Sequence, residues 1–161
     1  MIRPATDSDA SRILEIYGQG LETRNATFET EVPEWAVWDA KHHRFCRLIE
    51  EVDGAVAGWC AIAPVSARDC YRGVAEVSVY VDTGWLGQGI GGRLLDALVD
   101  ASEQAGIWTL YSSIFPENEA TRRVHVARGF EELGVRRRIA QLDGVWRDTL
   151  LLERRSDVVG L

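Results

Sequence analysis

The amino-acid sequence predicts a single α/β (α+β) domain with a mixed, mostly antiparallel sheet of six to seven strands and helices on both faces. Three observations support this fold class. Segments with strand-like alternation and segments with helical spacing follow one another along 161 residues, the length of one domain. Two Asp-Gly pairs, at 53–54 and 143–144, each separate two strand-like runs and so predict hairpins. A glycine-rich turn at 86–92 lies between a strand-like run and a helical one.

Spacing and capping residues assign the first half of the chain. Apolar residues at helical spacing predict a first helix that Thr6 or Asp7 caps, and Pro33 is suited to begin a second helix. The predicted elements are a strand over 2–5, the first helix, a polar loop at 25–29, a helix from Pro33 to His42 and His43, strands over 47–52 and 55–63, and a loop over 65–73.

The second half continues with strands and two helices. The predicted elements are a strand over 74–81, the glycine turn, a helix that Gly106 ends, a strand over 109–115, a short helix between Asn118 and Gly129, and hairpin strands near 136–141 and 147–152. We place the domain at 1–155 and expect residues 156–161 to form a loose C-terminal tail.

Composition argues against several classes of function. The net charge of −7 disfavours a protein that binds nucleic acid or an anionic membrane, although arginines at 136–138, 147 and 154–155 could form a local basic patch. No apolar run approaches the ~20 residues of a membrane-spanning helix, and no signal core follows Met1. Three cysteines without a C-x-x-C pair imply no disulfide framework, so we expect a cytoplasmic protein. Because no ligand cluster has metal-binding spacing, we expect no metal.

The run Leu86-Gly87-Gln88-Gly89-Ile90-Gly91-Gly92 is the most informative motif. Glycines between a strand end and a helix start leave main-chain N–H groups free to bind an anion, at the positive end of the helix dipole. The run lacks the Gly-Lys-Ser/Thr of a Walker A loop, and its spacing and mid-chain position differ from those of a dinucleotide-binding turn. A phosphate-bearing cofactor is the leading interpretation, and a tight turn without a ligand is the alternative.

On this run the chain resembles the GNAT superfamily of acyl-CoA-dependent N-acetyltransferases. Gly89 and Gly91 match the glycines of the signature Gln/Arg-x-x-Gly-x-Gly/Ala, whereas Leu86 replaces its leading residue. The likeness covers Ile2 to about Glu153 and is greatest to the phosphinothricin acetyltransferase branch. It is carried by the segments 26–30, 52–58, 75–81, 116–121, 129–130 and 145–148. The resemblance implies a GNAT-like domain with acetyl-CoA as co-substrate.

Glu76 is the candidate catalytic base. Acetyl transfer needs an uncharged amine, so a group must accept the proton of the ammonium. Glu76 shares a strand face with Ser78 and Tyr80, and a carboxylate in an apolar strand is costly unless it is paired or functional. The resemblance places a catalytic glutamate at this position, acting directly or through water. The structural alternative is an ion pair with Arg72 or Arg123.

The resemblance also implies how the cofactor binds. A main-chain N–H near Val79 would stabilise the thioester carbonyl oxygen, and the pantetheine arm would pair with the strand through Val79 and Val81. The pyrophosphate would lie on the amides of the glycine turn. The expected cofactor-binding residues are Val79, Tyr80, Val81, Gly87, Gln88, Gly89, Ile90, Gly91, Gly92 and Asn118.

The remaining candidates are a histidine and three acceptor-binding residues. His125 occupies the position at which many members of the superfamily carry a tyrosine, so the resemblance implies a proton donor to the leaving thiolate. Packing or a substrate contact is the alternative for this side chain. Arg72 is the candidate partner for an acceptor carboxylate, and Phe28 and Tyr71 are candidates for apolar walls.

These residues predict an enzyme that moves the acetyl group of acetyl-CoA directly to a small amino-acid-like amine. Phosphinothricin and methionine sulfoximine are the acceptors that the resemblance implies. The alternatives are acetylation of a protein N-terminus, a lysine or a polyamine, and a non-catalytic acyl-CoA-binding regulator. We expect a homodimer, with Trp146 suited to the interface, and no nucleic-acid or membrane partner.

Overall fold

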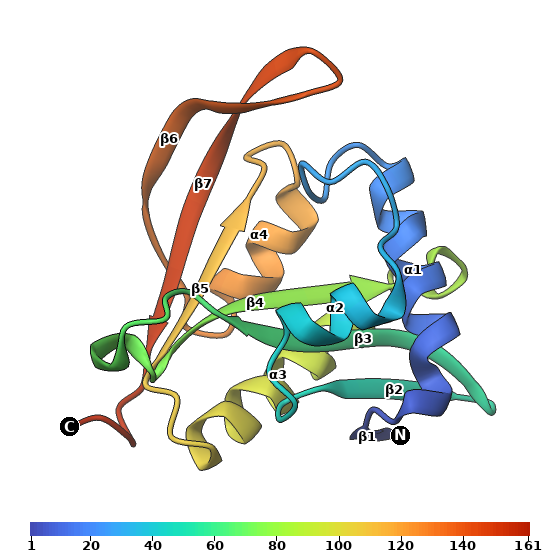
Figure 1. The fold of residues 1–161 in the computed structure, drawn as a ribbon, viewed down its shortest axis with the longest axis horizontal. Helices are drawn as coiled ribbons and strands as arrows, with labels where there is room; N and C mark the ends of the chain where they lie inside the picture. The colour runs from blue at the N-terminus through green and yellow to red at the C-terminus, as the bar shows by residue number, and fades with distance from the viewer.

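A seven-stranded sheet forms the centre of the protein in the computed structural model, which describes residues 1–161 (Figure 1). The elements in chain order are β1 (Ile2–Pro4), η1 (Asp7–Asp9), α1 (Ala10–Glu22), α2 (Trp35–Lys41), β2 (Leu48–Val52), β3 (Ala55–Pro64), η2 (Asp69–Tyr71), β4 (Val74–Val81), η3 (Thr83–Trp85), α3 (Ile90–Gln104), β5 (Thr109–Ile114), α4 (Glu119–Val126), β6 (Glu131–Leu142) and β7 (Val145–Arg155). The strand order is β1-β2-β3-β4-β5-β7-β6, and only β4 and β5 are parallel. The predicted fold class is confirmed.

Two hydrophobic clusters cover opposite faces of the sheet. One contains the apolar face of α3 and the side chains of Ala75 and Val77 from β4. The other contains α1 and Trp38 of α2, and Tyr80 of β4 packs against it. Successive strand residues point to opposite faces, and Ala75 and Val77 face α3. The side chain of Glu76 between them therefore points to the face covered by α1 and α2.

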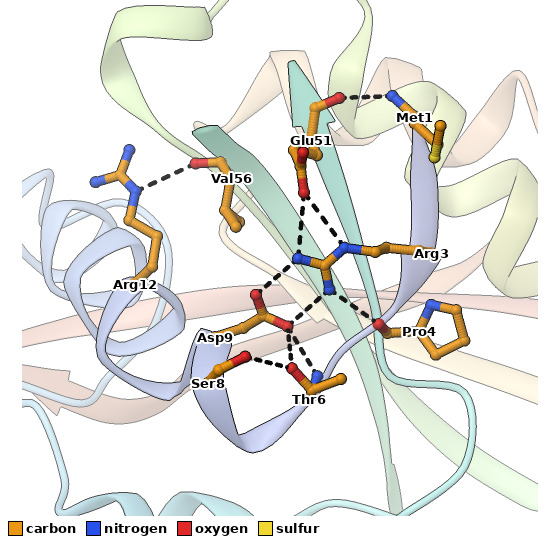
Figure 2. A network of polar contacts seen from close by, with 9 residues as sticks. All are labelled: Met1, Arg3, Pro4, Thr6, Ser8, Asp9, Arg12, Glu51 and Val56. Atoms are coloured by element: carbon orange, nitrogen blue, oxygen red, sulfur yellow. Dashed lines mark hydrogen bonds and ion pairs between the residues drawn. The ribbon is translucent and has the colours of Figure 1, made fainter. Parts of the chain in front are cut away.

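A polar network fixes the N-terminal strand to the start of the first helix (Figure 2). The guanidinium of Arg3 donates to both carboxylate oxygens of Asp9, each at 2.9 Å, and to Glu51 of β2 at 3.2 Å. The Thr6 N–H also donates to Asp9, at 2.8 Å, and Thr6 is the N-cap of η1, whereas α1 itself has Asp9 at its N-cap in place of the expected Thr6 or Asp7. The bond from Arg3 is the main cause that lowers the pKa of Asp9 to about 2, although burial opposes this shift. Asp9 therefore stays ionised, and Arg3 joins β1 to both η1 and β2.

The C-terminal hairpin differs most from its predicted form. Strands β6 and β7 contain 12 and 11 residues, so both extend well beyond the strands expected near 136–141 and 147–152. Nearly every residue of β6 is exposed, so its sequence shows no alternation between a buried and a solvent face. Figure 1 shows the distal part of the hairpin extending past the rest of the sheet.

The remaining expectations concern the tail, the thiols and the helices. Residues 156–161 form no helix or strand, and Ser156 at their start is buried with its hydroxyl donating to Glu103 at 2.8 Å. Cys46, Cys60 and Cys70 are free thiols. None of the helices combines the length and the hydropathy that crossing a membrane requires.

Candidate active site

The parallel strands β4 and β5 separate after Glu76. Residues 74–76 pair with 109–111, and the pairing ends there. Strand β4 nevertheless continues to Val81 and β5 to Ile114. The second half of β4 therefore has no strand partner on the side of β5.

The register of β4 with β3 determines which main-chain groups face this gap. The Asp82 N–H donates to the Ala57 carbonyl at 2.9 Å, and these two residues continue the antiparallel register of β3 and β4. Hydrogen-bonded pairs alternate in such a ladder, so Tyr80 directs its main-chain groups toward β3. The main-chain groups of Val79 and Val81 point into the gap, where an extended ligand chain could pair with them.

The glycine turn presents free amides at the start of α3. None of the main-chain N–H groups from Gly87 to Gly92 donates a hydrogen bond within the protein, and the first helical bond runs from Arg93 to Gly89. Gly87 and Gly89 both have φ of 76°, a conformation that glycine adopts at little cost. Leu86, in place of the usual Gln or Arg, is exposed. Free amides at the positive end of a helix dipole are suited to binding a phosphate.

Asp82 anchors the turn that leads to these amides. One oxygen of its buried carboxylate accepts from the Gly84 N–H at 2.7 Å. The other accepts from Arg12 at 2.6 Å and from Gln19 at 2.8 Å, both on α1. The side-chain Oε1 of Gln19 in turn accepts from the Thr83 N–H at 2.8 Å. Burial opposes the ionisation of Asp82, but these hydrogen bonds and the Arg12 charge outweigh it and lower its pKa.

A cavity of about 390 Å³ lies beside the gap. It is lined by α1, α2, α4, the segment 26–33 and the facing parts of β3, β4, β5 and β7. The predicted site residues that line it are Phe28, Glu76, Val79, Tyr80, Val81, Asn118 and His125. The structure therefore brings together residues from widely separated parts of the chain.

Glu76 has no partner in this cavity. Its carboxylate is exposed and accepts no hydrogen bond or ion pair, while Arg72 and Arg123 pair with other carboxylates. The ion pair weighed as the structural alternative is therefore absent. Partial desolvation by the surrounding protein raises the pKa of Glu76, and the charge of Lys41 acts in the opposite direction. A carboxylate without a partner and with a raised pKa is suited to accepting a proton.

His125 is buried in the cavity wall. Its Nδ1 lies 2.7 Å from the Thr121 carbonyl, and its Nε2 has no hydrogen-bond partner. Burial lowers the pKa of His125, and the bond to Thr121 compensates only in part. The ring is therefore neutral near pH 7, with its proton on Nδ1 and a lone pair on Nε2.

Two other predicted residues shape the wall at the 26–33 segment. Phe28 packs edge-on against Phe115 with ring centroids 4.9 Å apart. The Asn118 side chain accepts from the Thr121 N–H at 3.3 Å, which caps α4 as predicted, and donates to the Asn25 carbonyl at 3.2 Å. Asn118 thus fixes α4 to the segment that carries Phe28.

Tyr71 and Arg72 lie outside the cavity. Both lie in the exposed loop before β4, and Arg72 donates to Asp69 and lies 5.4 Å above the Trp108 ring. The cavity begins at Glu76, so the intervening residues of β4 separate this loop from it. Tyr71 and Arg72 are close to Glu76 in sequence, but they do not line the cavity that contains Glu76.

Sequence reasoning missed the contribution of α2. Trp38, Lys41 and His42 line the cavity, and Lys41 is the only lysine or arginine among the lining residues. His42 stacks on Trp38 with ring centroids 4.2 Å apart. The helical spacing of these residues marks a packing face, but nothing in the sequence relates that face to Glu76.

No group of His, Cys, Asp and Glu side chains is arranged to hold a metal ion.

Comparison with known proteins adds four findings. Residues 11–130 match the acetyltransferase (GNAT) family. A phosphinothricin N-acetyltransferase of Streptomyces viridochromogenes is 30% identical over 95% of this chain and 86% of its own. An L-methionine sulfoximine/L-methionine sulfone acetyltransferase of Pseudomonas paraeruginosa is 29% identical over 97% and 94%. A GNAT superfamily phosphinothricin acetyltransferase from Sinorhizobium meliloti, crystallised with AcCoA, has a TM-score of 0.90 and 26% identity over 99% and 90% of the chains.

Proposed function

The chain belongs to the acetyltransferase (GNAT) family and is an acetyl-CoA-dependent N-acetyltransferase, and we propose that its acceptor is a small amino-acid-like amine. The named relatives act on phosphinothricin and on methionine sulfoximine or methionine sulfone. Each of these compounds carries an α-amine beside an α-carboxylate. The cavity at Glu76 is large enough for a molecule of that size.

The gap and the glycine turn fit acetyl-CoA, which supplies an acetyl group activated as a thioester. The free amides of Gly87 to Gly92 would hold the diphosphate, and the main-chain groups of Val79 and Val81 would pair with the pantetheine arm. These two parts adjoin, because a Cβ at Gly91 would lie 3.5 Å from Val81 and 4.0 Å from Val79. Gln88, Ile90 and Asn118 complete the proposed cofactor site, whereas Tyr80, with its main chain toward β3 and its ring against Tyr17 and Trp59, is left to the cavity wall.

The observation that carries the catalytic proposal is the unpaired carboxylate of Glu76 beside this gap. Glu76 would accept the proton of the acceptor ammonium, directly or through water, and its raised pKa strengthens it as a base. The Val79 N–H points into the gap and would donate to the thioester oxygen, where negative charge develops. Base and hydrogen-bond donor thus lie on the same strand.

We assign His125 a contact with the reactants through Nε2. A neutral ring protonated on Nδ1 has no Nε2 proton to give to a leaving thiolate. It can accept a hydrogen bond from the acceptor amine or from the thiol. A thiol is also a good leaving group, so transfer does not require a dedicated acid.

A thiol-release assay tests the proposed function. The protein is incubated with acetyl-CoA and a panel containing L-methionine sulfone, L-methionine sulfoximine, phosphinothricin, proteinogenic amino acids and polyamines, and the products are identified by mass spectrometry. We expect N-acetylated amino-acid analogues. Release with polyamines alone would contradict the acceptor class. Binding of CoA without thiol release for any amine would instead favour a non-catalytic regulator.

We further propose that the protein is a cytoplasmic homodimer whose interface includes the β6–β7 hairpin. The hairpin exposes large apolar side chains, among them Leu133, Val135, Ile139, Val145 and Trp146. Such a group on a projecting hairpin is typical of an interaction surface. Sedimentation velocity should give the mass of two chains, and Trp146→Asp should shift the equilibrium to one. We expect no nucleic-acid or membrane partner, in keeping with the net charge of −7.

A further inference from the structure

Lys41 is a cation without a partner in the wall of the acceptor cavity. It occupies the last position of α2, three residues after Trp38, so both side chains lie on the helix face that lines the cavity. The ammonium forms no ion pair, whereas Arg44 and Arg47, which follow it in the chain, both bind Asp39. Lys41 is therefore the only full positive charge that the cavity offers to a ligand.

The other charges around the cavity are all negative. Glu76 lies on β4, and Glu29 and Glu31 lie on the segment 26–33, which lines the cavity. Lys41 and Glu76 do not form an ion pair, although the charge of Lys41 acts on the ionisation of Glu76. The cavity thus presents the Lys41 ammonium and the Glu76 carboxylate from two different elements, and the two groups are not paired with each other.

We propose that Lys41 binds the α-carboxylate of the acceptor while Glu76 receives its α-amine. This inference rests on the proposed function and names the residue that selects an amino acid over a simple amine. An α-amino acid carries opposite charges on neighbouring atoms, which complement the separated charges of Lys41 and Glu76. Without Lys41, the remaining carboxylates of the cavity would repel an acceptor carboxylate. Arg72, which the sequence suggested for this task, lies outside the cavity.

Lys41→Met tests the inference because it keeps an unbranched side chain of similar length and removes the charge. Steady-state kinetics are measured with L-methionine sulfone and with its α-carboxamide, which keeps the amine but has no carboxylate. We expect the KM for the acid to rise about tenfold to a hundredfold, as for loss of one charge-assisted hydrogen bond, with kcat changed little. The KM for the carboxamide should change less than about twofold. Lys41→Arg should restore most of the affinity for the acid.

Arg44→Met is the matched control. Arg44 lies three residues further along, is exposed and does not line the cavity, so its replacement should leave both acceptors unaffected. Equal loss with the acid and the carboxamide in Lys41→Met, or no loss with either, would overturn the inference.

A binding measurement separates this inference from the proposed function. Calorimetric titration of L-methionine sulfone into the CoA-saturated protein reports on Lys41 even if no acetyl transfer occurs. Binding that Lys41→Met weakens, in a protein that releases no thiol, would support the carboxylate site and remove the proposed function. Turnover of L-methionine sulfone with wild-type affinity in Lys41→Met would support the proposed function and remove the inference.

Discussion

The glycine turn and the acceptor cavity adjoin along β4, yet they are made from different parts of the polypeptide. The turn offers main-chain amides of consecutive residues, from Gly87 to Gly92. The cavity offers side chains from separate elements, with Lys41 on α2, Glu76 on β4 and His125 on α4. A main-chain site depends on local conformation, whereas a side-chain site depends on how distant elements pack. Changes in the turn should therefore affect acetyl-CoA, and changes in the cavity should affect the acceptor and the chemistry.

Glu76→Gln should have the largest effect of any single change. Glutamine keeps the size of the side chain and cannot accept the proton, so kcat should fall by about 10²–10⁴-fold. The KM for acetyl-CoA should stay the same, because the amides of the turn are untouched. Stopped assays with saturating acceptor and varied acetyl-CoA measure both quantities. A fall of less than threefold would remove Glu76 as the base.

The pH dependence sharpens the same test. The base must be ionised, so kcat/KM for the acceptor should fall as pH drops through the pKa of Glu76, which lies above that of an ordinary glutamate. This acidic limb should be absent in Glu76→Gln.

The raised pKa of Glu76 also affects the stability of the fold. The folded protein holds the Glu76 proton more tightly than the unfolded chain, so ionisation destabilises the fold as pH rises through that pKa. Thermal denaturation near pH 7 should accordingly show a higher Tm for the glutamine variant.

Gly89→Val tests the main-chain side of the comparison. A β-branched residue at φ of 76° is strained, and its Cβ would lie 3.1 Å from Arg93. Distortion of the turn should raise the KM for acetyl-CoA by about tenfold to a hundredfold, the equivalent of about 1–3 kcal/mol. Gly54→Val is the control, because Gly54 has φ of 79° in a distant hairpin with open space around it. Equal effects of both variants on acetyl-CoA would mean that general destabilisation, not the turn, is responsible.

Asp82→Asn should have a smaller effect of the same kind. Loss of the charge weakens the bonds to Arg12 and to Gln19, so η3 and the glycine turn become less fixed. We expect the KM for acetyl-CoA to rise about threefold to tenfold, with kcat changed less, the equivalent of about 1 kcal/mol. Because the pKa of Asp82 is lower in the folded protein than in the unfolded chain, its ionised carboxylate stabilises the fold at pH values above the unfolded-state pKa. This stabilisation is lost as the pH falls through the folded-state pKa. The stability difference between wild type and variant should therefore shrink in acid. As a control, Asp7→Asn at an exposed position should change neither the KM for acetyl-CoA nor the stability of the protein.

Acceptor preference should show the smallest effect. Glu29, Glu31 and Glu76 outnumber Lys41 in the cavity wall, so an acceptor with a second anionic group is disfavoured. We expect kcat/KM for L-methionine sulfone to exceed that for phosphinothricin by about threefold at low salt, and less at high salt. A double variant, Glu29→Gln with Glu31→Gln, should narrow the ratio. A preference for phosphinothricin that is independent of salt would contradict this account of the cavity.

Local patterns made the turn and the strand before it predictable. Glycine spacing, the Asp-Gly hairpins and the alternation of β4 all lie within a few residues, and the structure has the corresponding elements. Lys41 was not predictable as a cavity residue, because its nearness to Glu76 arises from the packing of α2 above the sheet. The bonds of Asp82 likewise join it to Arg12 and Gln19, 70 and 63 residues earlier in the chain. Arg72 was a reasonable candidate by sequence distance, but the loop before β4 lies outside the cavity.

Helix α1 is shared by both regions. Arg12 and Gln19 hold the strand end that leads to the glycine turn, while Tyr17 of the same helix lines the acceptor cavity. If binding of one ligand orders α1, the second ligand loses less conformational entropy when it binds. By thermodynamic linkage, the factor by which bound acetyl-CoA changes the affinity for the acceptor equals the factor by which bound acceptor changes the affinity for acetyl-CoA.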